Sequence, residues 1–520
     1  MPLTFNNALD VDVEATVENT PVSEVHAHAK KMSVDFSLTE CTLVRRERPG
    51  LLMVDFDAGG TTDPRNWARW YKRWVSGLSV IMISLAMSSS GALIPFSAAL
   101  DSQYGIGVFV NELFVAQFTM SFCVGPLILA PLSEKYGRKP VLLVSWIAFT
   151  LLYIGAAVST AATSVVACHI VAGLFISAPM TISPAVIADV WGFPSREEAM
   201  AIYALAIVAP PIGAASGGIL LKLGVNQHSV FWIYTIIGAL MTVLVAFTMR
   251  ETYRPLILLK HARRLREETG DDRFKAPLEV PQIDLGLGAR CLCNMLARPI
   301  RLFIHEPLLA IVSAYLAIIQ MCSSIFVQGC TSAFGASTGI VSTLGASSAT
   351  LIIGGIAVMF SYIFVVHRRF SVRHAEAFAP ERVPPEVRLV LSKWAAPVFA
   401  VTFFWFGWTL FNTFSSVVPL VSGVVMGGAI FLLVFPVLNY IVEVYEGITA
   451  SAMASVVVSM NLFPALFPLF STRMFLVLTP HWALTVAGCI ALLVTPFPTL
   501  LIRYGSMMRA RSGYASRAHA

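Results

Sequence analysis

The sequence contains few charged residues: they make up 13% of its 520 positions, whereas soluble domains have about 25%. The nucleotide-binding pattern GxxxxGK[ST] is missing, so we do not expect ATP to be the energy source. No nucleophile stands with a base in a recognisable catalytic pattern, and we therefore expect no enzymatic activity. Residues 1–60 are polar and mixed in charge and contain no signal-peptide pattern, so we expect later apolar segments to direct the chain into a membrane.

The positions of the cysteines also give no sign of disulfide pairs. The eight cysteines are scattered, and most lie in apolar segments or on the side expected to face the cytoplasm. We therefore expect free thiols rather than disulfides. Cys291 and Cys293 lie close together, but no second pair of ligands lies near them. We expect neither a metal site nor another cofactor.

Long apolar segments dominate the rest of the chain, since 56% of its residues are hydrophobic. A helix needs roughly 20 apolar residues to cross a membrane, because lipid offers no partner for backbone polar groups. The sequence contains twelve such candidates and therefore predicts an all-α polytopic membrane protein. They lie near residues 74–95, 110–131, 140–160, 165–189, 199–221, 229–249, 306–327, 344–367, 394–413, 415–440, 448–475 and 481–503.

A charged interruption divides the twelve segments into six and six. If the N-terminus is cytoplasmic, all but Lys222 and Arg473 of the 36 Lys and Arg residues fall on the cytoplasmic side. The positive-inside rule then puts both termini in the cytoplasm, and nucleic-acid binding need not explain the net charge of +6. The expected parts are an N-terminal tail (1–73), two six-helix halves (74–249 and 306–503), a cytoplasmic central loop (250–305) and a C-terminal tail (504–520).

The N-terminal tail lacks sustained apolar periodicity up to about residue 60, which is typical of a disordered segment. Close to the first apolar segment it reads DPRNWARWYKRW, at residues 63–74. Tryptophans interleaved with Arg and Lys favour a helix that lies at the level of the lipid headgroups.

A short polar loop, APLSEKYGRKP at residues 130–140, lies between the second and third segments. Its charges cannot lie in hydrocarbon, and Gly137 permits the sharp turn of a hairpin between two helices. With its flanks, GPLILAPLSEKYGRKPV, it resembles the 2–3 loop of fungal twelve-span drug:proton antiporters of the major facilitator superfamily. Further segments resemble the same group, over roughly residues 63–510: DPRNW, IADVW, RETYRP, RPIRLFIHEP, PERVPP, FLLVFPVLNYIVEVY and FPLFSTRMF.

The resemblance implies a major facilitator fold, with two pseudo-symmetric six-helix halves around a central cavity. It also implies a latch in the outward-facing state, in which Arg138 pairs with Asp189 and Glu134 faces the start of the eleventh helix. Lys139 belongs to the same charged loop. Arg138 can donate two hydrogen bonds to a carboxylate, and a partly buried pair is sensitive to the loss of one partner. The alternative is that these charges only solvate a loop.

The second half contains a corresponding acid. Glu443 lies near the cytoplasmic end of the tenth segment, and Arg368 and Arg369 are its expected partners. We therefore include these three residues in the expected latch.

The fifth segment contains APPIGAASGG, at residues 209–218. It resembles the antiporter motif GPxxGPxxGG, with Ala209 and Ala214 in place of a Gly and a Pro. That motif is characteristic of exporters, and the direction of transport rests on this analogy. Its prolines kink a helix and its glycines let another backbone approach closely, which simple helix packing also explains. The residues concerned are Pro210, Pro211, Gly213, Gly217 and Gly218.

His169, in the fourth segment, stands where the fungal relatives usually have an Arg that is implicated in proton coupling. A His can carry a proton near neutral pH, but a membrane His is as often a hydrogen-bonded structural residue. Met460 in the eleventh segment likewise replaces an Arg of the relatives. The acids Glu112 and Asp101, near the outer end of the second segment, could join a proton path.

The cavity lining is predicted from polar and aromatic residues within the segments. For each of them, hydrogen bonding between helices or packing on the lipid side is an alternative role. No strong buried charge marks an ionic substrate, so we expect a neutral, weakly polar or amphipathic one. The candidates are Ser88, Ser90, Gln117, Gln320, Gln328, Trp405 and Asn412.

These patterns together predict a secondary active exporter of a small organic molecule, such as a secondary metabolite, toxin or drug. It would work by alternating access and proton antiport, as a monomer in the cell membrane, with the vacuolar membrane as an alternative. A rival interpretation is an uptake permease or facilitator for a polyamine, organic acid or other nutrient. A non-transporting receptor is the alternative from another class.

Overall fold

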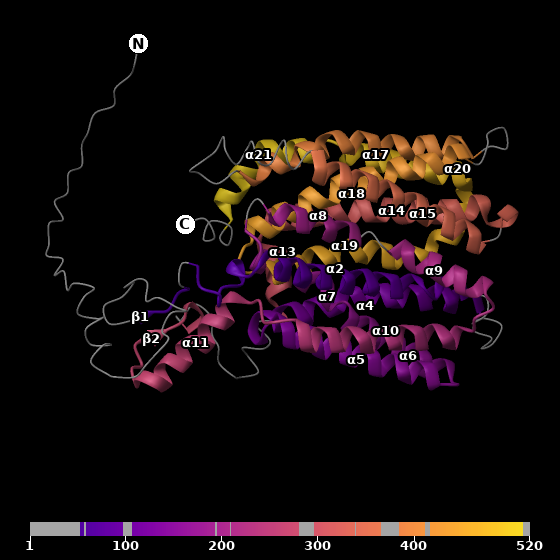
Figure 1. Ribbon diagram of the computed structural model, residues 1–520. Coiled ribbons are helices and arrows are strands. Elements are labelled where there is room, and N and C mark those ends of the chain that lie inside the picture. The colour runs from indigo at the N-terminus through magenta and orange to yellow at the C-terminus, as the bar shows by residue number, and fades with distance from the viewer. Residues whose placement is uncertain are drawn as a thin grey trace, which may run out of the picture.

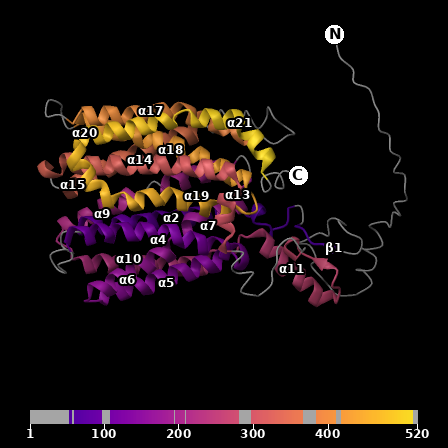
Figure 2. The same ribbon diagram turned by 180° about the vertical axis from the view of Figure 1, so that it is seen from behind.

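The computed structural model describes residues 52–56, 59–96, 107–192, 195–207, 210–279, 296–338, 340–365, 384–410 and 417–512. Most of its helices run side by side as a long bundle, and a small group of elements protrudes from one end (Figures 1 and 2). The protruding group contains helix α11 (Arg254–Thr269), and we call this end of the bundle the α11 end.

The first half of the described chain forms one side of the bundle, from indigo to magenta in Figure 1. A proline stands in the first turn of two of its helices, at Pro179 and at Pro210. Proline is tolerated there because the first amides of a helix have no partner within it. The helices are α2 (Arg69–Gly91), α4 (Gly107–Tyr136), α5 (Arg138–Val158), α6 (Ala162–Ile176), α7 (Ala178–Val190), α8 (Arg196–Ile207), α9 (Pro210–Lys222) and α10 (Gln227–Thr248).

The second half forms the other side, from salmon to yellow. A non-helical residue, Thr479, bends α20 directly before Pro480. The helices are α13 (Arg298–His305), α14 (Pro307–Thr338), α15 (Ile340–Ser361), α17 (Val390–Trp408), α18 (Val417–Val444), α19 (Thr449–Leu466), α20 (Pro468–Val494) and α21 (Phe497–Arg511). Short 3-10 helices are η1 (Pro64–Asn66), η2 (Ile94–Phe96), η3 (Pro277–Glu279) and η5 (Pro385–Leu389).

Nine helical stretches of the described chain are long and apolar enough to cross a membrane. Two shorter apolar helices, Ile212–Lys222 and Ala349–Val365, accompany them. A helix also lies over each of the twelve segments predicted from the sequence. The predicted all-α polytopic class is therefore confirmed.

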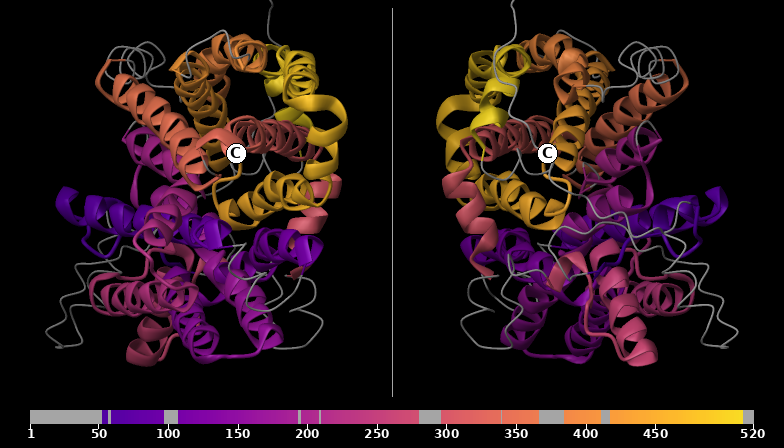
Figure 3. Two further views of the ribbon diagram at one scale, coloured as in Figure 1. Left: turned by 90° about the vertical axis from the view of Figure 1, so that its right-hand side faces the viewer. Right: turned by 90° about the vertical axis from the view of Figure 1, so that its left-hand side faces the viewer.

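The most extensive contacts between the two halves are made by four pairs of helices: α4 with α19, α7 with α19, α8 with α18, and α9 with α15. Seen along the bundle, the two sets of helices lie one above the other (Figure 3). The buried apolar residues of both sides belong to one continuous cluster, which includes Phe122 of α4 and Met453 of α19. The halves are thus packed directly on each other in this state.

A small unit protrudes at the α11 end. Strand β1 (Leu52–Met53), which precedes the bundle in the sequence, pairs in parallel with β2 (Phe274–Lys275), which follows α11. Val54 and the apolar face of α11 are buried in a separate small cluster. This unit attaches the segment before α2 to the segment that joins the two halves.

Candidate functional site

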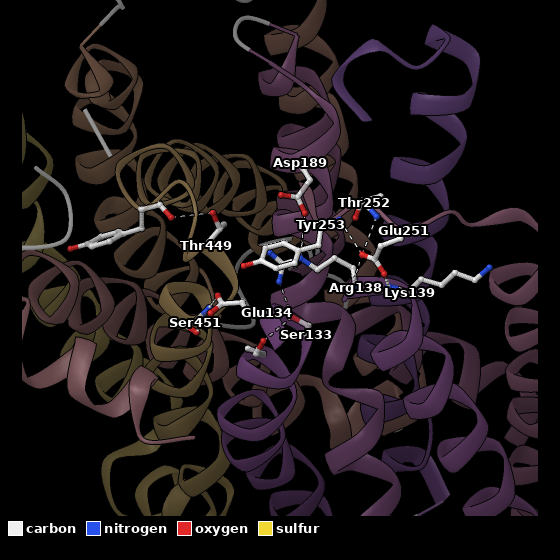
Figure 4. Close-up of polar contacts among 12 residues, drawn as sticks. Ser133, Glu134, Arg138, Lys139, Asp189, Glu251, Thr252, Tyr253, Thr449 and Ser451 are labelled. Atoms are coloured by element: carbon white, nitrogen blue, oxygen red, sulfur yellow. Dashed lines mark hydrogen bonds and ion pairs between the residues drawn. The ribbon is translucent and has the colours of Figure 1, made fainter. Parts of the chain in front are cut away.

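Arg138, the first residue of α5, lies at the centre of a polar network at the α11 end (Figure 4). Only 1% of its surface is exposed. Its Nε lies 3.3 Å from Oδ2 of Asp189 near the end of α7, and its Nη1 donates to Oγ of Ser133 at 2.8 Å. The guanidinium also lies 4.5 Å from the centre of the Tyr253 ring. The buried charge therefore has an acid, a hydroxyl and an aromatic face as partners, which offset its loss of water.

A turn at Gly137 brings the start of α5 against Glu251. The φ of Gly137 is 104°, which favours glycine, and a Cβ there would lie 2.4 Å from Oε2 of Glu251 and would displace that carboxylate. Glu251 accepts hydrogen bonds from the backbone N–H groups of Arg138, at 2.8 Å, and Lys139, at 3.2 Å. The first amides of a helix have no partner within it and carry partial positive charge, so Glu251 stabilises the start of α5.

The side chains around this turn are also held. The ammonium of Lys139 donates to the carbonyl of Ala246 in α10 at 2.8 Å. Burial raises the pKa of the Tyr253 hydroxyl, so the ring that covers Arg138 is a neutral phenol. Arg138, Asp189 and Glu251 all belong to the first half or to the segment directly after it, so their contacts do not cross between the halves.

Glu134 makes the contact that does cross. One of its carboxylate oxygens accepts from the backbone N–H of Ser451 at 2.9 Å, and the other accepts from the Ser451 hydroxyl at 2.8 Å. Arg298 of α13 donates to the same carboxylate at 3.0 Å. Ser451 lies in the first turn of α19, so Glu134 satisfies a free amide there as Glu251 does in α5. The end of α4 is thereby attached to the second half.

A second charged cluster lies between α8, η5 and α18. Arg388 of η5 forms ion pairs with Glu443 at 2.8 Å and with Glu197 at 3.3 Å. Glu197 belongs to the first half and Glu443 to the second, so this cluster also crosses between them. The predicted partners of Glu443, Arg368 and Arg369, lie outside the described residues.

The segment before α2 bridges the same end. Asp63 accepts two hydrogen bonds from Arg254, at 3.1 and 3.2 Å. Arg65 forms an ion pair with Glu446, which follows α18 in the second half. Together with the clusters around Glu134 and Arg388, these pairs hold the ends of both halves together at the α11 end.

A cavity of about 350 Å³ lies between the halves. Helices α2, α4, α8 and α9 line one side of it, and α14, α15, α18 and α19 line the other. The lining is mostly apolar, and no residue in it is charged in the part of the chain that the structure describes. Its polar residues are Ser84, Ser90, Thr119, Gln320, Ser323, Ser324, Gln328 and Asn461.

The cavity lies away from the ion pairs. Its lining begins at Val80 on α2, Gln320 on α14 and Asn461 on α19. These helices start eleven to thirteen residues earlier, at the α11 end, which corresponds to about 16–20 Å along a helix. The ion pairs therefore separate the cavity from the α11 end.

Only some of the predicted cavity residues line the cavity in the structure. Ser90, Gln320 and Gln328 line the cavity. Ser88 and Trp405 are not among its lining residues: the hydroxyl of Ser88 is buried 2.7 Å from the Tyr234 hydroxyl within the first half, and Trp405 is 37% exposed on α17. Asn412 lies outside the described residues, and the side chain of Gln117 is not described.

The antiporter-like segment forms α9, which packs closely on α2. A Cβ on Gly213 would lie 1.9 Å from the carbonyl oxygen of Ser88, and one on Gly217 would lie 2.1 Å from that of Ala92. Only glycine permits two helix backbones to approach in this way. Gly218 is buried beside them, and Pro210 and Pro211 are the first residues of the helix.

His169 is buried in α6 within an aromatic cluster of the first half. Its ring stacks on Phe118 with centroids 4.3 Å apart and meets Tyr153 and Phe231 at 6.0 and 6.1 Å. It is not among the residues that line the cavity. Met460, in α19, is buried as well.

Of the remaining candidates, Asp101 lies outside the described residues, and for Glu112 the structure describes the helix but not the side chain. Among the described residues no cluster of three or more His, Cys, Asp or Glu could hold a metal ion. The five cysteines that the structure describes are all free thiols, which agrees with the expectation for those positions.

Several site residues escaped the sequence analysis. Glu251 is the second residue after an apolar segment, and an acid at that boundary is a signal that could have been followed. Glu197 and Arg388 stand at similar boundaries. Ser84, Ser323, Ser324 and Asn461 carried no signal, because nothing in a sequence tells which face of a buried helix borders a cavity.

Comparisons with known proteins agree with this architecture. The family model of the Major Facilitator Superfamily matches residues 78–446. The Major facilitator superfamily multidrug transporter FLU1 of Candida albicans is 30% identical over 474 residues, which cover 89% of this chain and 76% of that protein. Efflux pump FUBT of Fusarium oxysporum is 31% identical over 472 residues, which cover 87% of this chain and 76% of the pump.

Two solved structures share the fold. The proton:xylose symporter XylE aligns with a TM-score of 0.61 at 12% identity, over 84% of this chain and 97% of the symporter. The human organic anion transporter MFSD10 aligns with a TM-score of 0.54 at 16% identity, over 83% of this chain and 99% of that chain. With this fold, the family match and relatives that are similar over most of its length, the chain belongs to the Major Facilitator Superfamily of membrane transporters.

Proposed function

We propose that the chain exports a small, neutral organic molecule by alternating access, in antiport with protons. One observation carries the proposal: a cavity between the halves is separated from the α11 end by ion pairs that cross between them. Opening that end requires these pairs to separate, which is the change that alternating access demands. A closed α11 end is what the outward-facing state requires.

The proposed orientation puts the α11 end in the cytoplasm, in the cell membrane or alternatively the vacuolar membrane. Its support is the distribution of Lys and Arg along the sequence. Cys291 and Cys293 then lie on the cytoplasmic side, and a membrane-impermeant thiol reagent should label them only in permeabilised cells. A variant with both residues changed to Ser identifies the labelled positions. Labelling of these two thiols in intact cells would reverse the orientation.

The direction of transport is inferred from three kinds of support. The relatives FLU1 and FUBT are described as a multidrug transporter and an efflux pump. The glycines of α9 stand in the pattern of the antiporter motif, and they are packed as that pattern requires. The lining residues that the structure describes are uncharged and offer no counterion for a polyamine or an organic acid. We therefore favour export of a neutral compound over uptake of a charged nutrient.

The test compares metabolites inside and outside cells that have or lack the gene. An exporter predicts that its substrate accumulates inside the deletion strain, whereas an uptake permease predicts less of it inside. A receptor without transport activity predicts no change in either compartment. The compound found in this way is then loaded into sealed vesicles that contain the purified protein. Export that stops when the proton gradient is collapsed supports antiport, and export that continues makes the protein a facilitator.

A further inference from the structure

The two serines of α2 that line the cavity donate their hydroxyl protons to backbone carbonyls of the same helix. Ser84 and Ser90 of α2 donate their hydroxyl protons to the carbonyls of Val80 and Met87, at 2.9 and 2.6 Å. A hydroxyl has one proton and two lone pairs. What these two residues can offer a molecule in the cavity is therefore an acceptor.

The opposite wall repeats this arrangement. Ser323 and Ser324 of α14 donate to the carbonyls of Ile319 and Gln320, at 2.8 and 3.0 Å. Helix α2 belongs to the first half and α14 to the second, so acceptors line the cavity from both sides.

Asn461 of α19 adds a fifth acceptor. Its amide nitrogen donates to the carbonyl of Val457 at 2.8 Å. A carbonyl can only accept, so the nitrogen must be the atom that faces Val457, and the side-chain oxygen is left for other partners. Among the described lining residues, side-chain donors come from Thr119, Gln320, Gln328 and the second N–H of Asn461, and each of these residues also has an acceptor. Acceptors therefore outnumber donors around the cavity.

We infer that the cavity selects neutral, largely apolar molecules that carry hydroxyl or N–H donors. It selects them over molecules of the same size and shape that only accept hydrogen bonds. The inference rests on the proposed function, because it assigns this cavity to the exported molecule. A ligand that displaces water without donating leaves buried lone pairs unsatisfied, whereas a phenol or alcohol satisfies them. A cation also donates, but none of the described lining residues is an acid that could balance its charge.

The experiment compares two probes of one shape: a biphenyl with a hydroxyl at each end, and its bis-methyl ether. Binding to the purified full-length protein in lipid nanodiscs is measured by calorimetric titration without a proton gradient. We expect the diol to bind at least about tenfold more tightly, since one good hydrogen bond is worth about that factor. Equal binding, tighter binding of the ether, or binding of neither probe would overturn the inference.

Variants then assign the preference to the cavity. Asn461→Leu removes an acceptor at similar volume, and Ser323→Ala removes another, so each should reduce the preference for the diol several-fold. Ser79→Ala is the matched control: Ser79 is also on α2 and donates to its own helix, at Val75, but does not line the cavity. A preference that survives both cavity variants, or that Ser79→Ala reduces equally, places the selection elsewhere and overturns the inference.

Transport separates this inference from the proposed function. If the diol binds with the expected preference but is not moved by the protein in vesicles, export of this class fails and the selection by the cavity stands. If both probes are exported equally well and bind equally, export stands and the selection fails.

Discussion

The backbone N–H of Arg138 donates a 2.8 Å hydrogen bond to Glu251, although 113 residues separate the two in the sequence. This bond joins the end of the first half to the turn before α5, and Tyr253 then covers the Arg138 side chain. The turn is thus fixed within the first half, while Glu134, four residues before Arg138, reaches Ser451 in the second. The network therefore has one part within the first half and one contact between the halves, and the proposed alternating access requires the second to break.

The ion pair of Arg138 and Asp189 is the first test of the network. Each single change to Ala should abolish transport, because an unpaired buried charge costs about 3–5 kcal/mol. The exchange Arg138→Asp with Asp189→Arg should recover part of the activity. Transport is measured in vesicles, with the amount of protein in the membrane determined in parallel. Normal transport by either single variant would contradict a role of this pair in the latch.

Glu251 should contribute to stability through the start of α5. Glu251→Gln removes the charge that faces two free amides at a helix N-terminus, which should lower stability by about 1 kcal/mol or somewhat more. A lower midpoint of thermal unfolding in detergent is the expected result. Asp271→Asn is the control, because Asp271 forms its contacts on the exposed surface with Arg273. An unchanged midpoint of thermal unfolding for Glu251→Gln would show that the negative charge of Glu251 does not stabilise the protein.

Gly213 should not tolerate any side chain. The Cβ of Gly213→Ala would lie 1.9 Å from a backbone oxygen of α2, so α9 would have to move away from it. We expect little folded protein in the membrane, measured by fluorescence-detected size exclusion. Gly77→Ala is the matched control in α2, since no atom lies within 4 Å of a Cβ there and alanine favours helices. Equal yields of the two variants would contradict the close packing of α2 and α9.

His169 can be tested with a variant that keeps its stacking. His169→Phe retains an aromatic ring against Phe118 but cannot carry a proton, whereas His169→Ala loses both properties. If His169 takes part in proton coupling, both variants should lose gradient-driven export while ligand binding persists. His169→Arg should keep partial function with an altered pH dependence. Normal export with an unchanged pH profile in the Phe variant would leave His169 a packing role alone.

Much of the architecture followed from the sequence. The apolar segments predicted the helices, because a chain in lipid must satisfy its backbone within each segment. The loop at residues 130–140 predicted the turn at Gly137, and its resemblance to the antiporter loop implied a contact of Arg138 with Asp189, which lies 3.3 Å away in the structure. Gly213 and Gly217 predicted a close helix contact, since glycine in an apolar helix has few other advantages.

Tertiary structure alone decided which residues meet. Glu251 and Arg388 carry charges like many others in the sequence, and their partners depend on how distant helix ends are brought together. The same holds for the cavity: Ser88 and Ser90 lie two residues apart on α2, yet Ser90 lines the cavity and Ser88 contacts Tyr234. In a helix that is apolar on all sides, periodicity does not distinguish the face toward a cavity from the face toward another helix. The sequence by itself therefore determined the membrane class and its turns, whereas the packing of the two halves decided the partners of each charge and the lining of the cavity.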